Sequence, residues 1–277
     1  MKNWLENKTI LVTGASSGIG KELTKVLINK YKANVIGIAR REEKLKELKV
    51  SLEEKQAQFD YVCADVSVKE DWQKIYNYVK NKNVSMLINN AGTMPNFSLA
   101  KNTEEDLLER VFKTNFYSCY YGYKTFCEDF RKIDNSSIIN IGSASALCSI
   151  PGQSIYSASK SAQLSFFKIV SSEEKGKIFI ATYLPGFTKT ELFNNKDNAK
   201  PIFDEKSLKF INNFCMPSSK LANKIAKAIV RKKRLKKFGK DTAFLKFLNS
   251  VAPNKSCDLY LKVFKKTNFE CFKDMFK

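Results

Sequence analysis

Short apolar segments alternate with longer amphipathic segments along most of this chain, and this alternation restricts the fold more than any other feature. Short runs rich in β-branched residues predict strands buried on both faces, and apolar residues at helical spacing predict helices that cover them. Together they predict βαβ units with right-handed crossovers, which give an α/β fold with a doubly wound parallel sheet. The predicted strands lie near 8–13, 34–39, 59–64, 85–89, 137–142 and 177–184, and the predicted helices near 18–30, 41–56, 68–81, 103–132, 155–174 and 217–233.

The last third of the chain departs from this alternation. Only a short piece near Leu235–Gly239 can supply a seventh strand. We therefore predict a single domain over residues 1–240, followed by a basic, amphipathic, helical extension over 241–277. Residues 194–217 are polar and lack a clear period, which suggests a lid over a substrate site.

A glycine-rich turn, Thr13-Gly14-Ala-Ser-Ser-Gly18-Ile-Gly20, follows the first predicted strand and opens a helix. Gly14 allows a tight turn, Gly18 lets backbone N–H groups approach a pyrophosphate, and Gly20 permits close packing of helix on strand. The positive end of the helix dipole also favours an anion there. The turn therefore predicts a dinucleotide site with contacts from Gly14, Ser16, Ser17, Gly18, Ile19 and Gly20.

Two arginines, Arg40 and Arg41, follow the second predicted strand. A cofactor with a free 2′-hydroxyl would call for an acidic residue there, whereas a guanidinium can bind a 2′-phosphate. The sequence therefore favours NADP(H), with NAD(H) as the alternative. Asp65, at the end of the third strand, can accept a hydrogen bond from an adenine amino group or cap the next helix.

Ser143, Tyr156 and Lys160 are the main candidates for catalytic chemistry. The run Ile138–Ile141 predicts a buried strand, and Ser143 lies just past its carboxyl end. After a proline-glycine turn, Tyr156 and Lys160 share one face of a helix because they are four residues apart. A hydroxyl, a phenol and an ammonium can therefore converge where open α/β sheets bind ligands.

Composition excludes several other kinds of site. The chain has no histidine, so histidine triads, histidine zinc ligands and histidine general bases are excluded, and we predict no metal site. Its seven cysteines form no Cys-x-x-Cys pair and are expected to be free thiols. There is no signal peptide and no apolar run of about 18 residues, so we expect a cytoplasmic protein without a membrane span.

The net charge of +20 is concentrated in the C-terminal part of the chain. Residues 196–277 contain 21 basic and 7 acidic residues, a net charge of +14, and the run Arg231–Lys237 is the densest. Beyond residue 240, apolar residues recur at helical spacing between lysines. This pattern predicts peripheral contact with a membrane surface, and the alternatives are packing on the protein's own core or a solvated face. No nucleic-acid partner is expected.

These motifs together resemble those of the short-chain dehydrogenase/reductase family. They cover about 1–192 in the family's order: the glycine turn, Asp65, Asn89–Gly92, Asn115, Ser143, Tyr156, Lys160 and Pro185-Gly186-x-Thr188-x-Thr190. The resemblance implies a Rossmann-type sheet of about seven strands. It also implies a nicotinamide cofactor and hydride transfer between that cofactor and a carbonyl or alcohol.

The resemblance also implies roles for individual residues. Tyr156 would be the general acid, Lys160 would lower the pKa of its phenol and hold the nicotinamide ribose, and Ser143 would orient the substrate carbonyl. Asn115 would anchor a water that connects Lys160 to solvent. The other implied cofactor contacts are Asp65, Val66, Asn90, Ala91, Gly92, Pro185, Gly186, Thr188 and Thr190. Candidate walls of an apolar substrate pocket are Met94, Leu147, Phe187 and Phe193.

The predicted function is NADPH-dependent reduction of a small-molecule ketone that is apolar or lipid-like, such as a 3-oxoacyl, sterol-like or other long-chain ketone. One alternative is an NAD-linked alcohol dehydrogenase working in the oxidative direction. Another is a nucleotide-sensing scaffold that binds partners through its basic tail. The family resemblance further implies a homo-oligomer that pairs through the helices near 103–132 and 155–174.

Overall fold

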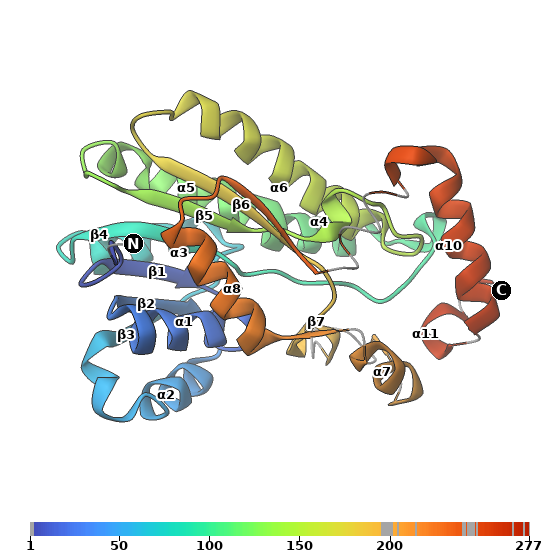
Figure 1. Cartoon of the computed structure of the whole chain (residues 1–277), viewed down its shortest axis with the longest axis horizontal. Helices are drawn as coiled ribbons and strands as arrows, with labels where there is room; N and C mark the ends of the chain where they lie inside the picture. The colour runs from blue at the N-terminus through green and yellow to red at the C-terminus, as the bar shows by residue number, and fades with distance from the viewer. Residues whose placement is uncertain are drawn as a thin grey trace.

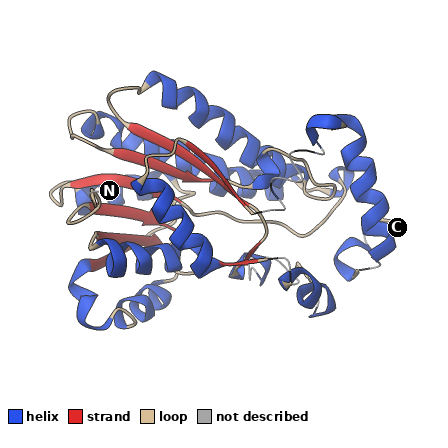
Figure 2. Ribbon diagram, in the orientation of Figure 1, coloured by secondary structure: helices blue, strands red, loops and turns tan. Residues whose placement is uncertain are grey.

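The structure of this chain, a computed structural model, has a twisted sheet between two layers of helices, with the last helices grouped beyond one edge of the sheet (Figures 1 and 2). It describes residues 3–194, 202–203, 205–213, 215–239, 242, 247, 249–267, 269–273 and 275–276.

Seven parallel strands form the central sheet, in the order β3-β2-β1-β4-β5-β6-β9. The chain direction across the sheet reverses between β1 and β4, so the predicted doubly wound α/β architecture is confirmed. The short seventh strand also exists, and its first residue Leu235 lies opposite Thr182 of β6. The strands are β1 (Thr9–Thr13), β2 (Asn34–Ala39), β3 (Phe59–Cys63), β4 (Val84–Asn89), β5 (Ser137–Ile141), β6 (Phe179–Pro185) and β9 (Leu235–Phe238), and a separate small sheet pairs β7 (Thr188–Lys189) with β8 (Met216–Pro217).

Helices cover both faces of the sheet and continue beyond its carboxyl edge. The α-helices are α1 (Gly18–Tyr31), α2 (Glu42–Val50), α3 (Lys69–Val79), α4 (Glu105–Phe112), α5 (Ser118–Phe130), α6 (Ser154–Glu173), α7 (Glu205–Asn212), α8 (Ser218–Val230), α10 (Pro253–Thr267) and α11 (Glu270–Lys273). Short 3-10 segments are η1 (Glu53–Gln58), η2 (Ala100–Asn102), η4 (Ala144–Ala146) and η5 (Glu191–Asn194), and η3 (Lys113–Tyr117) is a π-helical turn.

The strands bury apolar side chains on both faces because successive residues of a strand point in opposite directions. In β1, Ile10 and Val12 join a core with the side chains of α1 and α8, whereas Leu11 joins a second core with those of α3, α5 and α6. Both faces of the sheet are therefore closed, and ligands are left with the carboxyl edge, where the connecting loops gather.

Two predicted helices differ from the observed ones. The helix predicted over 41–56 ends at Val50 because Glu53 adopts a left-handed φ of +49°, and η1 follows. The helix predicted over 103–132 is interrupted by the π turn η3 between α4 and α5. A π turn inserts one extra residue into a helix and is frequent at functional sites. Here it contains Asn115, whose side chain is fully buried.

The C-terminal helices pack against the carboxyl edge of the sheet through an apolar cluster. This cluster, here called the cap cluster, contains Met94, Phe97, Tyr156, Ile202, Phe203, Cys215, Phe272 and Met275. The Phe97 ring lies edge-on to Phe272, with centroids 4.9 Å apart, and Phe264 stacks on Phe272 at 4.1 Å. One side of the C-terminal extension therefore packs on the protein's own core, as one of the sequence alternatives proposed.

No helix in the described part of the chain is both long enough and apolar enough to cross a bilayer.

Candidate active site

The glycine turn joins β1 to α1 at the carboxyl edge of the sheet. Gly14 has a left-handed φ of +67°, and a Cβ added to it would lie 2.9 Å from Ala91 Cα. A Cβ on Gly20 would collide with the carbonyl oxygen of Gly14. Both positions therefore need glycine, and α1 can begin at Gly18 with its first N–H groups directed at this edge, where they have no partner within the helix.

The segment after β4 holds the glycine turn in place. The backbone N–H groups of Asn90 and Ala91 donate to Thr13 Oγ1 at 2.9 and 3.0 Å, and Asn90 Nδ2 donates to the Thr13 carbonyl at 2.9 Å. Asn90 therefore supports the turn, and with Ala91 and Gly92 it also lines the adjacent cavity.

The two arginines after β2 differ in their surroundings. Arg41 reaches over the glycine turn, where its Nη2 donates to Ser17 Oγ at 2.8 Å and to Ser16 Oγ at 3.2 Å, and its Nη1 donates to Glu191 at 3.3 Å. Arg40 instead lies 3.8 Å from the carboxylate of Asp65. Both side chains line the cavity, but only Arg41 is held beside the two turn serines.

Asp65 does not cap the next helix, because α3 begins at Lys69 after Val68. Its Oδ1 instead accepts from the backbone N–H and the hydroxyl of Ser67, at 2.9 and 2.7 Å. Asp65 and Val66 both line the cavity.

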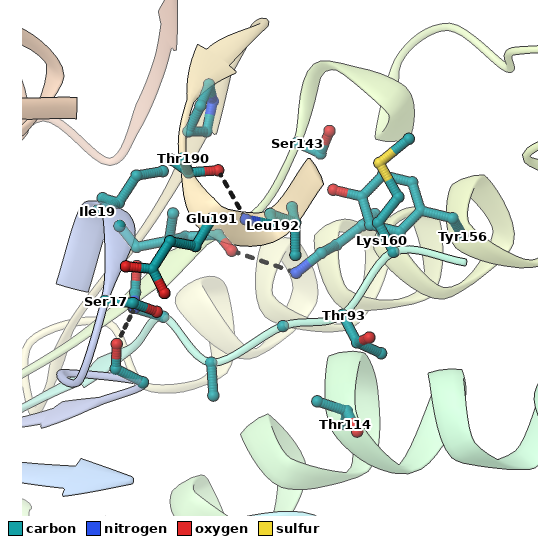
Figure 3. A pocket seen from close by; sticks show the side chains of 18 of the residues that line it. Ser17, Ile19, Thr93, Thr114, Ser143, Tyr156, Lys160, Thr190, Glu191 and Leu192 are labelled. Carbon is teal, nitrogen blue, oxygen red and sulfur yellow. Dashed lines mark hydrogen bonds between the residues drawn. The ribbon is translucent and has the colours of Figure 1, made fainter. Parts of the chain in front are cut away.

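Ser143, Tyr156 and Lys160 come together at the other end of the same cavity. Figure 3 shows the hydroxyls of Ser143 and Tyr156 directed into the same space, with Lys160 beside the tyrosine ring. Ser143 follows β5, and its Oγ accepts from the Ser145 N–H at 3.1 Å. The side chains of Tyr156 and Lys160, one turn apart on α6, are 7% and 4% exposed, so both polar groups act in a largely dry environment.

Asn115 lies behind Lys160 and not in the cavity wall. Its Oδ1 accepts from the Thr93 N–H at 2.8 Å, and its Nδ2 donates to the Thr93 carbonyl and to Ser159 Oγ, both at 3.0 Å. A Cβ on Gly92 would lie 3.3 Å from Asn115 Oδ1 and 3.4 Å from Lys160 Nζ. The absence of a side chain at Gly92 therefore lets the asparagine and the lysine approach the same point.

Burial is the largest cause of the pKa shifts of Tyr156 and Lys160. It raises the pKa of the Tyr156 phenol above its ordinary value, and hydrogen bonding with Ser143 acts in the opposite direction. Burial also lowers the pKa of Lys160, whose Nζ donates to the Ile141 carbonyl at 3.5 Å. The lowering of the tyrosine pKa that the resemblance implies stays a prediction for the enzyme with its nicotinamide cofactor bound.

The segment after β6 closes the cavity from the opposite side. Thr188 Oγ1 donates to the Gly186 carbonyl at 3.0 Å, and Thr190 Oγ1 accepts from the Leu192 N–H at 3.3 Å. A Cβ on Gly18 would lie 3.3 Å from the Thr190 side chain, so this segment reaches the glycine turn. Pro185, Gly186, Thr188 and Thr190 all line the cavity.

The cavity, with a volume of about 550 Å³, runs from the arginines to Tyr156. It gathers every predicted site residue except Gly20, which packs beneath the turn, and Asn115. Sequence reasoning missed several lining residues that belong to no motif: Ile38, Ala39, Ala64, Thr93, Phe97, Arg110, Thr114, Ile141, Gly142, Ala144, Ser145, Ile150, Gln153, Glu191 and Leu192. A minority of them end a strand or directly follow one, namely Ile38, Ala39, Ala64, Ile141 and Gly142, and for these the position was a signal that could have identified them.

The predicted apolar walls are only partly correct. Met94 and Phe187 line the cavity. Leu147 does not line it, and its carbonyl accepts from Asn249 Nδ2 at 3.1 Å. The side chain of Phe193 lies outside the described residues.

A family model described as short chain dehydrogenase matches residues 8–201, about two thirds of the chain. The chain belongs to the short-chain dehydrogenase family. It is accordingly an oxidoreductase that depends on NAD(P), and the resemblance seen in its motifs is confirmed.

Several curated proteins resemble this family member. A 3-oxoacyl-[acyl-carrier-protein] reductase of Buchnera aphidicola is 34% identical over 197 residues, which are 70% of this chain and 79% of that protein. An uncharacterised oxidoreductase of Listeria innocua is 31% identical over 193 residues, 68% of this chain and 77% of that protein. An 11-beta-hydroxysteroid dehydrogenase of Arabidopsis thaliana is 32% identical over 196 residues, which span 69% of this chain but only 55% of that longer protein.

Solved structures of short-chain dehydrogenases share the fold. One from Streptomyces avermitilis superposes with a TM-score of 0.77, at 23% identity, over 94% of this chain and 100% of that one. One from Sphingobium yanoikuyae in complex with NADPH gives a TM-score of 0.72, at 22% identity, over 83% of this chain and 87% of that one.

The site fits the nicotinamide dinucleotide that this family requires. The glycine turn leaves room where a Cβ would collide, and the start of α1 presents N–H groups to an anion. Beyond it, the cavity continues to Lys160 and Thr188, near which a nicotinamide riboside would lie.

Proposed function

We propose that this enzyme is an NADPH-dependent carbonyl reductase that converts a ketone to an alcohol. The observation that carries the proposal is the convergence of Ser143, Tyr156 and Lys160 in one cavity with the glycine turn and Arg41. Ser143, Tyr156 and Lys160 can supply a proton and orient a carbonyl. The glycine turn and Arg41 suit a phosphorylated dinucleotide.

In this mechanism Ser143 Oγ donates a hydrogen bond to the substrate carbonyl oxygen and orients the carbonyl group. When bound, a reduced nicotinamide would supply the hydride for the carbonyl carbon, and Lys160 and Thr188 would hold it. Tyr156 Oη donates its proton to the oxygen that becomes the alcohol. The phenol carries its proton at neutral pH, and the alkoxide that forms on hydride addition is basic enough to take it.

Lys160 and Asn115 complete the proposed catalytic set. The buried ammonium of Lys160 stabilises the phenolate left on Tyr156, and protonation of the phenolate restores the acid. Asn115 acts as a positioning residue. Its hydrogen bonds to Thr93 and Ser159 hold the π turn beside Lys160, where a water can connect the lysine to solvent.

NADPH is the proposed cofactor because Arg41 holds a positive charge beside Ser16 and Ser17, at the end of the cavity where a 2′-phosphate would lie. The remaining proposed contacts are Gly14, Gly18, Ile19, Gly20, Arg40, Asp65, Val66, Asn90, Ala91, Gly92, Pro185, Gly186, Thr188 and Thr190. An NAD-linked alcohol dehydrogenase stays the alternative, since Asp65 lies close enough to Arg40 to offset its charge.

The proposed substrate is an apolar or lipid-like ketone, such as a 3-oxoacyl thioester or a sterol-like ketone. The substrate end of the cavity is lined by Met94, Phe97, Ile150, Phe187 and Leu192. The names of the Buchnera and Arabidopsis relatives, a 3-oxoacyl reductase and a hydroxysteroid dehydrogenase, fit this class.

We propose residues 1–240 as the catalytic domain, with 194–217 as a lid over the substrate. The β7–β8 pair joins the end of that segment to the chain a few residues before its start, where the Met216 N–H donates to the Phe187 carbonyl, and this gives the lid a fixed base. Within it, Ile202 and Phe203 pack in the cap cluster beside Tyr156. The extension 241–277 contributes Phe272 and Met275 to the same cluster, so lid and extension together would exclude water from the site.

We also propose a homo-oligomer that pairs through the outer sides of α5 and α6. Exposed aromatic and apolar side chains occur there, including Tyr120 and Ile169 at 37% and 57% exposure. Light scattering of the purified chain after size exclusion tests this, since a monomeric mass at micromolar concentration would contradict it.

The test of function is oxidation of NADPH and NADH by the purified chain with ketones from short acyclic compounds to long 3-oxoacyl thioesters. We expect NADPH consumption with one class of apolar ketone. Tyr156→Phe should lower kcat/KM about 10²- to 10⁴-fold, the usual contribution of a general acid. Full turnover by that variant would remove Tyr156 from the mechanism, and Tyr183→Phe, also a buried tyrosine but on β6, is the matched control.

A further inference from the structure

The last helices of the chain expose several large apolar side chains to solvent. Phe247 and Val251 are 63% and 67% exposed, and Leu259 and Val263 of α10 are each 47% exposed. Side chains of this kind are normally buried. Leu259 and Val263 are four residues apart on α10, so these two side chains lie next to each other on its surface.

On α10 the exposed apolar side chains share a face with lysines. Positions 255, 259, 262, 263 and 266 follow one another at helical spacing, so Lys255, Leu259, Lys262, Val263 and Lys266 form one face, here called the outer face of α10. All five are exposed.

The opposite side of α10 packs on the domain. Its Phe264 stacks on Phe272 and lies edge-on to Phe97, with centroids 6.1 Å apart for the second pair. Figure 1 shows α10 at the far edge of the molecule, beyond the carboxyl ends of the strands. The outer face is therefore directed away from the sheet and is free to meet an extended surface.

The charge of α10 is strongly positive. The helix contains four lysines and a single acidic residue, Asp258. Lysines placed between exposed apolar side chains are typical of helices that lie in the interface of an anionic bilayer, where the apolar groups enter the headgroup region and the ammonium groups meet lipid phosphates.

We propose that the outer face of α10 docks the protein on an anionic lipid bilayer. A nucleic acid would match the lysines but would leave Leu259 and Val263 without a role, so the combination favours lipid. Because Phe264, on the inner side of α10, contacts the Phe97 wall of the cavity, docking would place the substrate end near the membrane. Only that last consequence depends on the proposed ketone substrate.

Sedimentation of the full chain with phosphatidylcholine vesicles, with and without phosphatidylglycerol, tests the proposal. We expect binding to the anionic vesicles only. A juxtamembrane lysine contributes about fivefold to such binding, so Lys255→Glu/Lys262→Glu/Lys266→Glu should weaken it at least about 100-fold. Leu259→Ser/Val263→Ser keeps all charges and should weaken it about tenfold through the loss of apolar contact.

The matched control is Lys30→Glu/Lys69→Glu/Lys175→Glu, which changes the net charge equally at exposed lysines of α1, α3 and the turn after α6. It should bind nearly as well as the unmodified protein. The proposal is overturned if anionic vesicles do not bind, if the control loses binding as fully as the α10 variant, or if the serine variant binds unchanged. Binding of a double-stranded DNA probe through the same lysines, without vesicle binding, would overturn it too.

NADPH turnover of every variant is measured in parallel without vesicles. Turnover should be unchanged, because the substituted side chains lie on the outer surface and not in the cavity. Vesicle binding by a protein that reduces no ketone would refute the proposed function and leave the membrane face intact. A ketone reductase that ignores vesicles would do the reverse.

Discussion

Replacement of Arg41 by alanine should change the cofactor preference of this enzyme more than the same change at Arg40. Arg41 holds its guanidinium 2.8 Å from Ser17 Oγ, whereas Arg40 lies 3.8 Å from Asp65, a neighbour that offsets its charge. A hydrogen bond to a charged group contributes about 1.5–3 kcal/mol. Because the Arg41 side chain is 47% exposed, we take the lower end, about 1.5–2 kcal/mol, which corresponds to about 12- to 30-fold.

Steady-state KM values for NADPH and NADH, together with the fluorescence of bound NADPH, measure this effect. Arg41→Ala should raise KM and Kd for NADPH by about 12- to 30-fold and leave those for NADH within about twofold, since NADH lacks the 2′-phosphate. Arg40→Ala, the matched control, should raise KM and Kd for NADPH by no more than about threefold, because an exposed charge contributes little to binding. A larger loss for Arg40→Ala, or equal losses for both cofactors in Arg41→Ala, would refute the assignment of the phosphate to Arg41.

Three further outcomes follow from the geometry. Gly20→Ala should weaken NADPH binding more than about tenfold, measured by fluorescence titration, because its Cβ would collide with the Gly14 carbonyl and force the start of α1 away from the turn. Arg131→Ala should destabilise the fold by about 3 kcal/mol and lower Tm by about 6 °C, because it leaves the buried Glu174 carboxylate without its main partner. Hydrogen bonds from Arg131 hold the pKa of Glu174 below its ordinary value. The stabilisation by this pair is therefore fully present above the ordinary pKa of Glu174, and it is lost as pH falls through the lowered pKa. A difference in Tm between Arg131→Ala and the unmodified protein that persists in strong acid would contradict this reasoning. Finally, kcat/KM for reduction should fall at alkaline pH with a limb below the ordinary lysine value, because burial lowers the pKa of Lys160, and a profile that stays flat to that value would exclude the lysine charge from the reaction.

The sequence alone was sufficient for the features that depend on neighbours along the chain. Each strand carries its own β-branched run, so its existence and burial followed from local pattern, as Ile138 and Ile139 illustrate. Gly14 and Gly20 were readable because only glycine fits a left-handed turn and a close helix start. Tyr156 and Lys160 share a helix face for the simple reason that they are four residues apart.

The tertiary structure decided which side chains meet across the fold. The burial of Asn115 depends on the π turn η3. Hydrogen bonds from Asn115 to Thr93 and Ser159, which are distant in sequence, stabilise this turn, and no pattern in the neighbouring sequence predicts it. Likewise, Arg40 and Arg41 are equivalent in sequence, and only the packing of the loop after β2 directs one to the glycine turn and the other to Asp65.

The C-terminal extension shows the same division. Its helical spacing and its lysines were evident from sequence, but that pattern fits a membrane face and a core-packing face equally well. The structure separates the two, because Phe264 and Phe272 stack on each other beside Phe97 while Leu259 and Val263 remain exposed. Periodicity specifies the faces of a helix, and only the position of the rest of the chain determines which face is covered.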